Sequence, residues 1–258
     1  MARGRKPSAT PASVEEKTTK VIVVEKKEFD ASKILETISV KVQCKNESQK
    51  KLIKSIKENE ITIVSGLPGT GKTFMACAEA LRMLKNHEFK QIILVKSVIQ
   101  LKGEETGFLP GDLKDKLEPY MISFIDNFEK IVGEQATAKL REAGLIKIQP
   151  LGFIRGRSID NSIIIADECQ NITLENMKTL LTRIGDNSKM VILGDTKQKD
   201  IKNKRDSSLE IVYKMFDGEE NFGCVLINNL DHIVRNKIIK VIEEKFDQYE
   251  EQQSIKPS

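Results

Sequence analysis

The sequence predicts one α/β domain with a mostly parallel sheet and helices on both faces. Three observations lead to this prediction. Short β-branched runs alternate with longer helical segments, one run enters a glycine-rich loop followed by a helix, and another run ends in two adjacent acids. Parallel strands need crossover connections, and alternating strands and helices supply them. A chain of 258 residues is long enough for one such domain with a full hydrophobic core.

The expected domain spans residues 20–247 and lies between two polar ends. Residues 1–19 are rich in Ala, Pro, Ser and Thr and carry several basic residues, which is typical of a disordered basic arm. Within the domain, a strand is expected at residues 20–25 and a helix at residues 47–57. Residues 248–258 are polar, and we expect them to form a C-terminal tail.

A phosphate-binding loop follows the first long strand. The apolar run at residues 61–64 predicts a buried strand, and residues 73–83 favour a helix. The segment between them fits the pattern G-x-x-x-x-G-K-[ST] at every position and consists of Gly66, Leu67, Pro68, Gly69, Thr70, Gly71, Lys72 and Thr73. We expect Lys72 to reach the β- and γ-phosphates of ATP and Thr73 to bind Mg²⁺. A glycine-rich turn that only caps a helix is the alternative, which the preceding strand disfavours.

Two acids end a second buried strand. Residues 163–166 form a continuous apolar run, which is typical of a strand buried on both faces. Ligands bind at the carboxyl ends of strands in open α/β sheets, so we expect this strand end beside that of the phosphate loop. There Asp167 suits the Mg²⁺ shell, and Glu168 is placed to polarise an attacking water. Two solvated acids are the common alternative, but the loop pattern in the same chain favours the catalytic interpretation.

The remaining runs complete the alternation of strands and helices. A strand at residues 189–193 leads to Gln198, an amide placed to contact the γ-phosphate or its attacking water. The other expected strands are residues 91–95, 146–149 and 224–228, and the other expected helices are residues 117–132, 134–143, 174–184, 207–216 and 236–246.

Several of these segments, taken in order, resemble the PhoH-like family of P-loop ATPases. The resemblance extends from residue 49 to residue 246. It rests on residues 66–73, 107–113, 119–120, 155–157, 167–171, 181–185, 194–198 and 233–235. That family looks like the first motor domain of superfamily 1 helicases. The resemblance therefore implies a RecA-like P-loop NTPase domain, ATP hydrolysis with Mg²⁺ and a link to RNA.

The resemblance also implies roles for residues outside the loop. Gln198 resembles the γ-phosphate sensor of helicases. Gln49 resembles the glutamine that recognises adenine, and an ordinary residue in the first turn of a helix is an equal alternative. Arg235 resembles the arginine that approaches the γ-phosphate, and Arg183 is its rival. The chain departs from the family pattern at residues 96–97, where Lys-Ser stands in place of Arg-Pro.

The net charge of +4 does not by itself indicate nucleic-acid binding. Residues 1–20 hold five basic and two acidic residues, and the other 37 basic and 36 acidic residues nearly balance. A local patch is therefore needed. Arg155 and Arg157, with Lys197 and Lys199 in a second basic loop, are candidates for contacts to the phosphates of single-stranded RNA or of DNA. Solvated loops are the alternative.

Cysteine usage and hydropathy exclude several other classes. The four cysteines are scattered without a C-x-x-C pair, so no zinc site is expected. No run approaches the ~20 apolar residues of a membrane span, and residues 1–13 lack the apolar core of a signal peptide. We therefore expect a cytoplasmic protein without membrane contact, in which Cys77 and Cys224 lie in the core.

The motifs leave two alternatives to an ATPase and also predict a homo-oligomer. A P-loop kinase would need an acceptor pocket, and a nucleotide-dependent nucleic-acid-binding module would lack motor activity. The adjacent Asp167 and Glu168 favour hydrolysis. A single motor domain leaves one side of the γ-phosphate open, so we expect a homo-oligomer in which Arg235 or Arg183 of a neighbour completes the site. Analogy with other single-domain P-loop motors suggests a hexameric ring.

Overall fold

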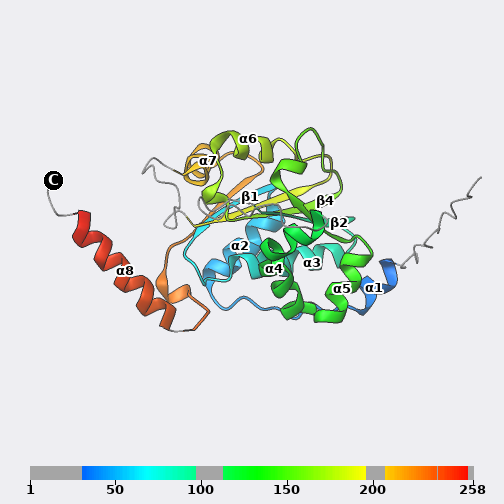
Figure 1. Cartoon of the computed structure of the whole chain (residues 1–258), viewed down its shortest axis with the longest axis horizontal. Coiled ribbons are helices and arrows are strands. Elements are labelled where there is room, and N and C mark those ends of the chain that lie inside the picture. The colour runs from blue at the N-terminus through cyan, green and yellow to red at the C-terminus, as the bar shows by residue number, and fades with distance from the viewer. Residues whose placement is uncertain (1–30, 97–112, 196–206, 237, 255–258) are drawn as a thin grey trace, which may run out of the picture.

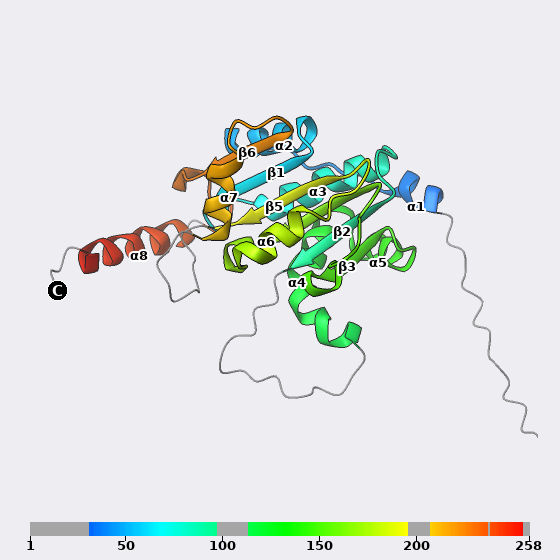
Figure 2. The same ribbon diagram turned by 90° about the horizontal axis from the view of Figure 1, so that it is seen from above.

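The computed structural model describes residues 31–96, 113–195, 207–236 and 238–254, and its centre is a six-stranded sheet (Figures 1 and 2). All paired strands are parallel, and their order across the sheet is β3-β2-β4-β5-β1-β6. The strands are β1 (Ile61–Gly66), β2 (Gln91–Lys96), β3 (Ile146–Pro150), β4 (Ser162–Asp167), β5 (Lys189–Gly194) and β6 (Phe222–Ile227). The predicted single α/β domain with a parallel sheet is confirmed.

The central strands are buried on both faces, as their apolar runs predict. Every residue of β1 and of β4 is buried. One expectation about their placement is wrong, because β1 and β4 are not neighbours: β5 pairs with both and lies between them. The number of residues between the phosphate loop and the two acids does not show which strand lies between β1 and β4 in the sheet.

Helices cover both faces of the sheet, one layer below it and one above it in Figure 1. The lower layer holds α1 (Ala31–Thr37), α2 (Glu47–Glu58), α3 (Lys72–Lys85), α4 (Leu113–Val132) and α5 (Glu134–Glu142). The upper layer holds α6 (Leu174–Leu181) and α7 (Ser208–Phe216). Each layer packs its own hydrophobic cluster against the sheet, with Phe124 and Leu52 in the lower cluster and Met177 and Leu209 in the upper one. The sheet therefore lies between two layers of helices.

Capping side chains explain where three helices begin. Asn46, Thr173 and Ser207 each accept a hydrogen bond from the backbone N–H three residues later, at the starts of α2, α6 and α7. Such caps satisfy one of the N–H groups that a helix start leaves without a partner. The start of α2 matters for function, because this helix lies directly behind the phosphate loop.

The structure differs from the expectations at several boundaries. α1 was not expected, and the strand expected at residues 20–25 lies outside the described residues. α6 ends at Leu181 instead of residue 184, because Ile184 pairs with Ile159 in an isolated bridge. The last helix, α8 (Ile238–Ser254), runs past the expected domain end at residue 247, so part of the expected tail is helical. In Figures 1 and 2, α8 projects from the body on the β6 side.

Candidate nucleotide-binding site

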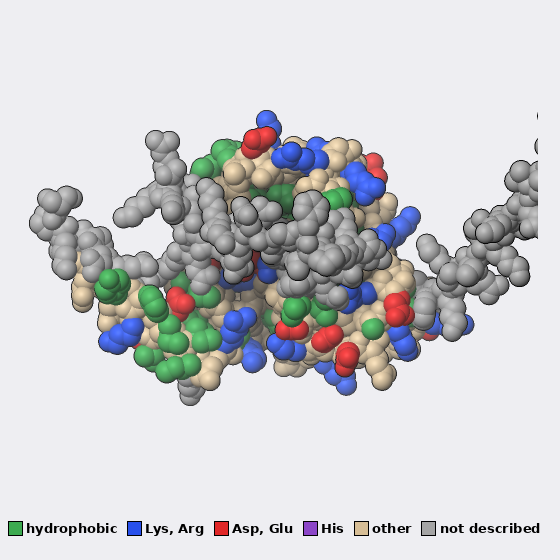
Figure 3. Space-filling model, viewed as in Figure 1, with side chains coloured by type: hydrophobic (Ala, Val, Ile, Leu, Met, Phe, Trp, Pro, Cys, Tyr) green, Lys and Arg blue, Asp and Glu red, His purple; other side chains and the backbone are tan. Residues whose placement is uncertain are grey.

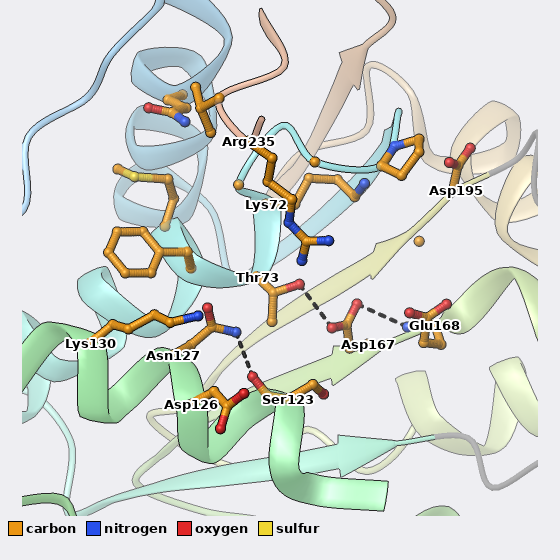
Figure 4. A pocket seen from close by; sticks show the side chains of 18 of the residues that line it. Lys72, Thr73, Ser123, Asp126, Asn127, Lys130, Asp167, Glu168, Asp195 and Arg235 are labelled. Atoms are coloured by element: carbon orange, nitrogen blue, oxygen red, sulfur yellow. Dashed lines mark hydrogen bonds between the residues drawn. The ribbon is translucent and has the colours of Figure 1, made fainter. Parts of the chain in front are cut away.

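A cavity of about 620 Å³ opens where β1, β4 and β5 end (Figure 4). The loop after β1 forms its floor, and the acids after β4 and β5 form one end. Side chains from the start of α3, from α4 and from the segment before α8 complete it. Parallel sheets place the carboxyl ends of their strands on one edge, so residues far apart in the sequence meet here.

Two glycines give the phosphate loop its shape. Gly69 has φ +73° and Gly71 has φ +83°, a backbone conformation that residues with a side chain rarely adopt. Gly66 is restricted for another reason, since a Cβ atom there would lie 2.7 Å from Cβ of Ile227 on the neighbouring strand β6. α3 begins at Lys72 directly after this turn, so the positive end of the helix dipole faces the cavity.

Three carbonyl groups of the loop already have hydrogen-bond partners within the protein, two of them from Gln49 and Val234, which also line the cavity. The side chain of Gln49 donates to Thr70 O at 3.0 Å, and Val234 N donates to Gly69 O at 3.0 Å. The hydroxyl of Thr70 donates to Leu67 O at 2.8 Å. Because these carbonyls already have partners on the protein side, the loop is preformed for an anion on its other side.

Lys72 occupies the centre of the cavity (Figure 4). Its Nζ donates to Gly66 O at 2.6 Å and to Leu67 O at 2.9 Å. Burial lowers the pKa of Lys72, while the charges of Asp195, Asp167 and then Glu168 act in the opposite direction. Within the described residues, the hydrogen bonds of the ammonium group go to these two neutral carbonyls, which phosphate oxygens can replace.

Thr73 and Asp167 are brought together across β5. The Thr73 hydroxyl donates to Asp167 Oδ2 at 2.8 Å, as the dashed line in Figure 4 shows. Burial is the main reason that the pKa of Asp167 is raised, and the charge of Glu168 adds to it; the Thr73 hydrogen bond opposes the shift. Two hard oxygen ligands beside a phosphate loop suit Mg²⁺, which prefers one or two protein oxygens together with phosphate oxygens. The predicted magnesium ligands therefore lie together.

Glu168 is oriented by the glutamine that follows it. Glu168 adopts φ +57°, an uncommon conformation for a residue with a side chain. Gln170 donates from Nε2 to Glu168 Oε2 at 2.8 Å and accepts at Oε1 from Asp195 N at 3.1 Å. Gln170 is only 1% exposed. It therefore links the ends of β4 and β5 and fixes the direction of the Glu168 carboxylate.

The two candidate arginines lie in different places. Arg235 lines the cavity of its own chain, and its Cδ would lie 3.5 Å from a Cβ placed on Gly69. Arg183 does not line this cavity. Its guanidinium donates to Arg157 O and Thr182 Oγ1, and its backbone carbonyl accepts a hydrogen bond from Ile159 N. Arg183 and Ile159 precede β5 and β4 in the chain, so Arg183 lies near the start of these strands and not near their carboxyl ends. Arg235 therefore lies at the phosphate loop of its own chain. Completion of the site by an arginine of a neighbour stays a prediction.

Gln49 contacts the protein with both ends of its amide. Besides the bond to Thr70, its Oε1 accepts from Lys45 N at 2.8 Å, and the residue is 3% exposed. These contacts brace the loop. Recognition of adenine by Gln49 stays a prediction, and Gln198, Lys197 and Lys199 lie outside the described residues.

A second group of candidates lies away from the cavity. Arg155 and Arg157 are exposed between β3 and β4, and Arg155 donates to Asn176 Oδ1 on α6 at 2.9 Å. Phe153 lies two residues before Arg155 and is 56% exposed. Sequence reasoning missed this aromatic residue, although an aromatic side chain beside two arginines was a visible signal.

Sequence reasoning also missed the contribution of α4. Ser123, Asp126, Asn127 and Lys130 line the cavity, and Figure 4 shows these four side chains on the side of the cavity opposite Glu168 and Asp195. No motif marks them, since only the packing of α4 beside α3 brings them to the site. Phe74, in the first turn of α3, also lines the cavity.

The described residues contain neither a cluster of metal-binding side chains nor a membrane-spanning helix. Within them, no group of three or more His, Cys, Asp or Glu side chains could hold a metal ion without other ligands. Among the helices of that part of the chain, none is long and apolar enough to cross a membrane. Of the two cysteines expected in the core, Cys77 is buried and Cys224 is half-buried.

Comparisons of the chain with known proteins identify its family. The family model described as PhoH-like protein matches residues 41–247. A PhoH-like protein of Bacillus subtilis (strain 168) is 37% identical over 206 residues, which are 80% of this chain and 64% of that protein. A PhoH-like protein of Synechocystis sp. is 34% identical over 209 residues, 81% of this chain and 63% of that protein.

The chain thus spans slightly less than two thirds of the length of these two relatives. Among solved structures, the large terminase from a thermophilic bacteriophage is similar with a TM-score of 0.46 and 11% identity, covering 77% of this chain and 49% of that one. The family match covers most of the chain, and the residues of the cavity fall within it. The chain belongs to the PhoH family of P-loop proteins.

Proposed function

We propose that this protein binds ATP together with Mg²⁺ and hydrolyses it. The observation that carries this proposal is the hydrogen bond of 2.8 Å from Thr73 Oγ1 to Asp167 Oδ2. Lys72 lines the same cavity, and so does Glu168, which follows Asp167 in the chain. A candidate metal-binding pair, a candidate phosphate-binding cation and a candidate base thus line one cavity. The family match supports the proposal.

Each side chain then has a distinct task. Lys72 exchanges its two carbonyl partners for phosphate oxygens, and Arg235 adds positive charge at the same loop. Glu168, held by Gln170, accepts hydrogen bonds from a water and orients it for attack. Mg²⁺, when bound at Thr73 and Asp167, neutralises charge on the β- and γ-phosphates. The Glu168 carboxylate beside Asp167, placed to orient a water, favours hydrolysis over a kinase reaction.

Phosphate release by three purified variants tests this function. Glu168→Gln should bind ATP with near wild-type affinity but lose turnover about a hundredfold or more, because the cavity keeps its shape and loses the carboxylate. Lys72→Ala should lose ATP binding as well. Glu175→Gln is the matched control, since Glu175 is exposed on α6 outside the cavity. Unchanged turnover in Glu168→Gln would overturn its assigned role.

We also propose that the protein contacts single-stranded nucleic acid, more readily RNA than duplex DNA, as a motor or remodeller. The favouring observation is the exposed Phe153 close in sequence to the exposed Arg155 and Arg157. Arginines contact phosphates, and an exposed ring can stack on a base. Lys197 and Lys199 are proposed to extend this surface. A binding module without motor activity is the remaining alternative.

Filter binding of RNA and DNA strands at two salt concentrations tests the contact. Arg155→Ala with Arg157→Ala should weaken binding and flatten its salt dependence, because fewer counterions are released. Phe153→Leu should weaken binding to single strands without changing the salt dependence. ATP affinity should stay unchanged in both variants. Absence of RNA and DNA retention at low salt would refute this part of the proposal.

A further inference from the structure

The cavity is larger than a triphosphate group needs. Its volume of about 620 Å³ lies in the range typical of pockets for whole small ligands. In Figure 4, Glu168 and Asp195 lie at one end, Lys72 and Thr73 lie between, and Asn127 and Lys130 lie at the other end. A nucleotide whose γ-phosphate meets Glu168 therefore extends its nucleoside toward α4.

Asn127 presents a defined atom at that end of the cavity. Its Nδ2 donates to the backbone carbonyl of Ser123, one turn earlier in α4, at 2.7 Å. The reversed amide would place two acceptor oxygens against each other, so this hydrogen bond fixes the orientation. The atom left for a ligand is Oδ1, which points away from the Ser123 carbonyl in Figure 4. Oδ1 can accept a hydrogen bond but cannot donate one.

We propose that Asn127 Oδ1 accepts a hydrogen bond from the 6-amino group of adenine and thereby selects ATP over GTP. Guanine carries an oxygen at that ring position, and two acceptors facing each other leave both without a donor. A site built to bond a polar group discriminates strongly against a ligand that lacks it. The inference rests on the proposed binding of a nucleoside triphosphate and adds the residue that selects the base.

Two further observations support a base at this end. Phe74 lines the cavity in the first turn of α3, directly after the candidate magnesium ligand Thr73, and offers an aromatic ring on which a base can stack. Gln49, the other candidate for reading the base, has both ends of its amide bonded to Lys45 N and Thr70 O.

Calorimetric binding of four probes separates the possible outcomes. The probes are ATP, GTP, dATP and inorganic tripolyphosphate, each with Mg²⁺ and the full chain. The wild-type protein should prefer ATP to GTP by about tenfold or more. Asn127→Ala should reduce that preference about tenfold, chiefly through weaker ATP binding, and leave tripolyphosphate binding unchanged. Phe74→Leu should weaken ATP and GTP alike. Glu129→Ala, on the same helix outside the cavity, is the control.

Each binding result that differs from these expectations overturns a specific part of the proposal. An ATP to GTP ratio that is the same in Asn127→Ala and wild type overturns the base assignment. So does a change confined to the ATP to dATP ratio, because the contact is then to the ribose hydroxyl. Loss of tripolyphosphate binding in Asn127→Ala also overturns it, since the residue then acts on the loop. If wild-type protein binds neither ATP nor tripolyphosphate, the proposed function itself fails.

Discussion

Lys72 lies near three carboxylates inside the cavity, and this makes phosphate binding sensitive to pH. Burial lowers its pKa from the ordinary value of 10.5, against the opposing charges of Asp195, Asp167 and Glu168. As the pH rises through this lowered pKa, Lys72 loses its charge. ATP affinity should therefore decline on the alkaline side below pH 10.5, and binding there should take up protons. Calorimetry in two buffers of different ionisation enthalpy measures this uptake, and proton release would contradict it.

Gln170 offers a test of how far one buried amide controls catalysis. It holds the Glu168 carboxylate at 2.8 Å but does not line the cavity. Gln170→Ala should lower kcat by about tenfold to a hundredfold with a smaller change in KM, because the base is present but poorly oriented. Steady-state phosphate release checks this. Gln91→Ala, which removes a bond to Ser162 at the opposite edge of the sheet, is the control and should leave kcat unchanged.

At the scale of elements, α2 acts as a brace for the phosphate loop. Gln49 joins the Lys45 backbone to the Thr70 carbonyl. Gln49→Ala leaves these two groups without their partner, at a cost of ~1–3 kcal/mol each where they are buried. Affinity for ATP, GTP and tripolyphosphate should therefore fall alike. A loss confined to adenine nucleotides would instead support recognition of adenine by Gln49. Lys51→Ala, exposed on the same helix, is the control.

The sequence was sufficient for elements whose pattern is local. The apolar runs of β1 and β4 and the glycines of the loop each specify their conformation within a few residues. The insertion of β5 between β1 and β4 was not predictable, because it depends on sheet pairing. α1 was missed because seven residues give too short a periodic pattern.

The same distinction applies to the candidate site. Lys72, Thr73 and Asp167 were predictable because strand ends in a parallel sheet meet at one edge. Asn127 was not, since its approach to the cavity is a consequence of α4 packing beside α3. Gln170 stood in a recognised motif, but its bond to Glu168 required the three-dimensional arrangement.

At the scale of the whole molecule, the position of Arg235 bears on whether subunits share a site. Arg235 lines the cavity of its own chain beside Gly69, so hydrolysis should not require a neighbour's Arg235. A mixture of Arg235→Ala and Lys72→Ala proteins should then show no recovered turnover, because every site lacks one group. Phosphate release from mixed and separate samples provides the measurement. Recovery toward about a quarter of wild-type turnover would instead show sharing between subunits in a ring.

Assembly itself should depend on α8. This helix projects from the body, and Figure 3 shows hydrophobic side chains gathered where α8 starts. Val241, Ile242 and Phe246 are exposed, Phe246 to 64%. An exposed apolar helix face of this kind favours contact with another chain, and we expect a second copy of this protein there, in a homo-oligomer for which a hexameric ring remains the prediction.

Replacing two of these side chains tests the contact without touching the cavity. Ile242→Asp with Phe246→Asp should reduce the native mass by light scattering to that of one chain, because a charge in an apolar interface has no partner. Lys245→Ala on the same helix is the control and should keep the assembly. Turnover per chain should persist in the monomeric double variant, since all the residues assigned to hydrolysis belong to one chain. A wild-type protein that is already a monomer, or a double variant that stays assembled, would refute this role of α8.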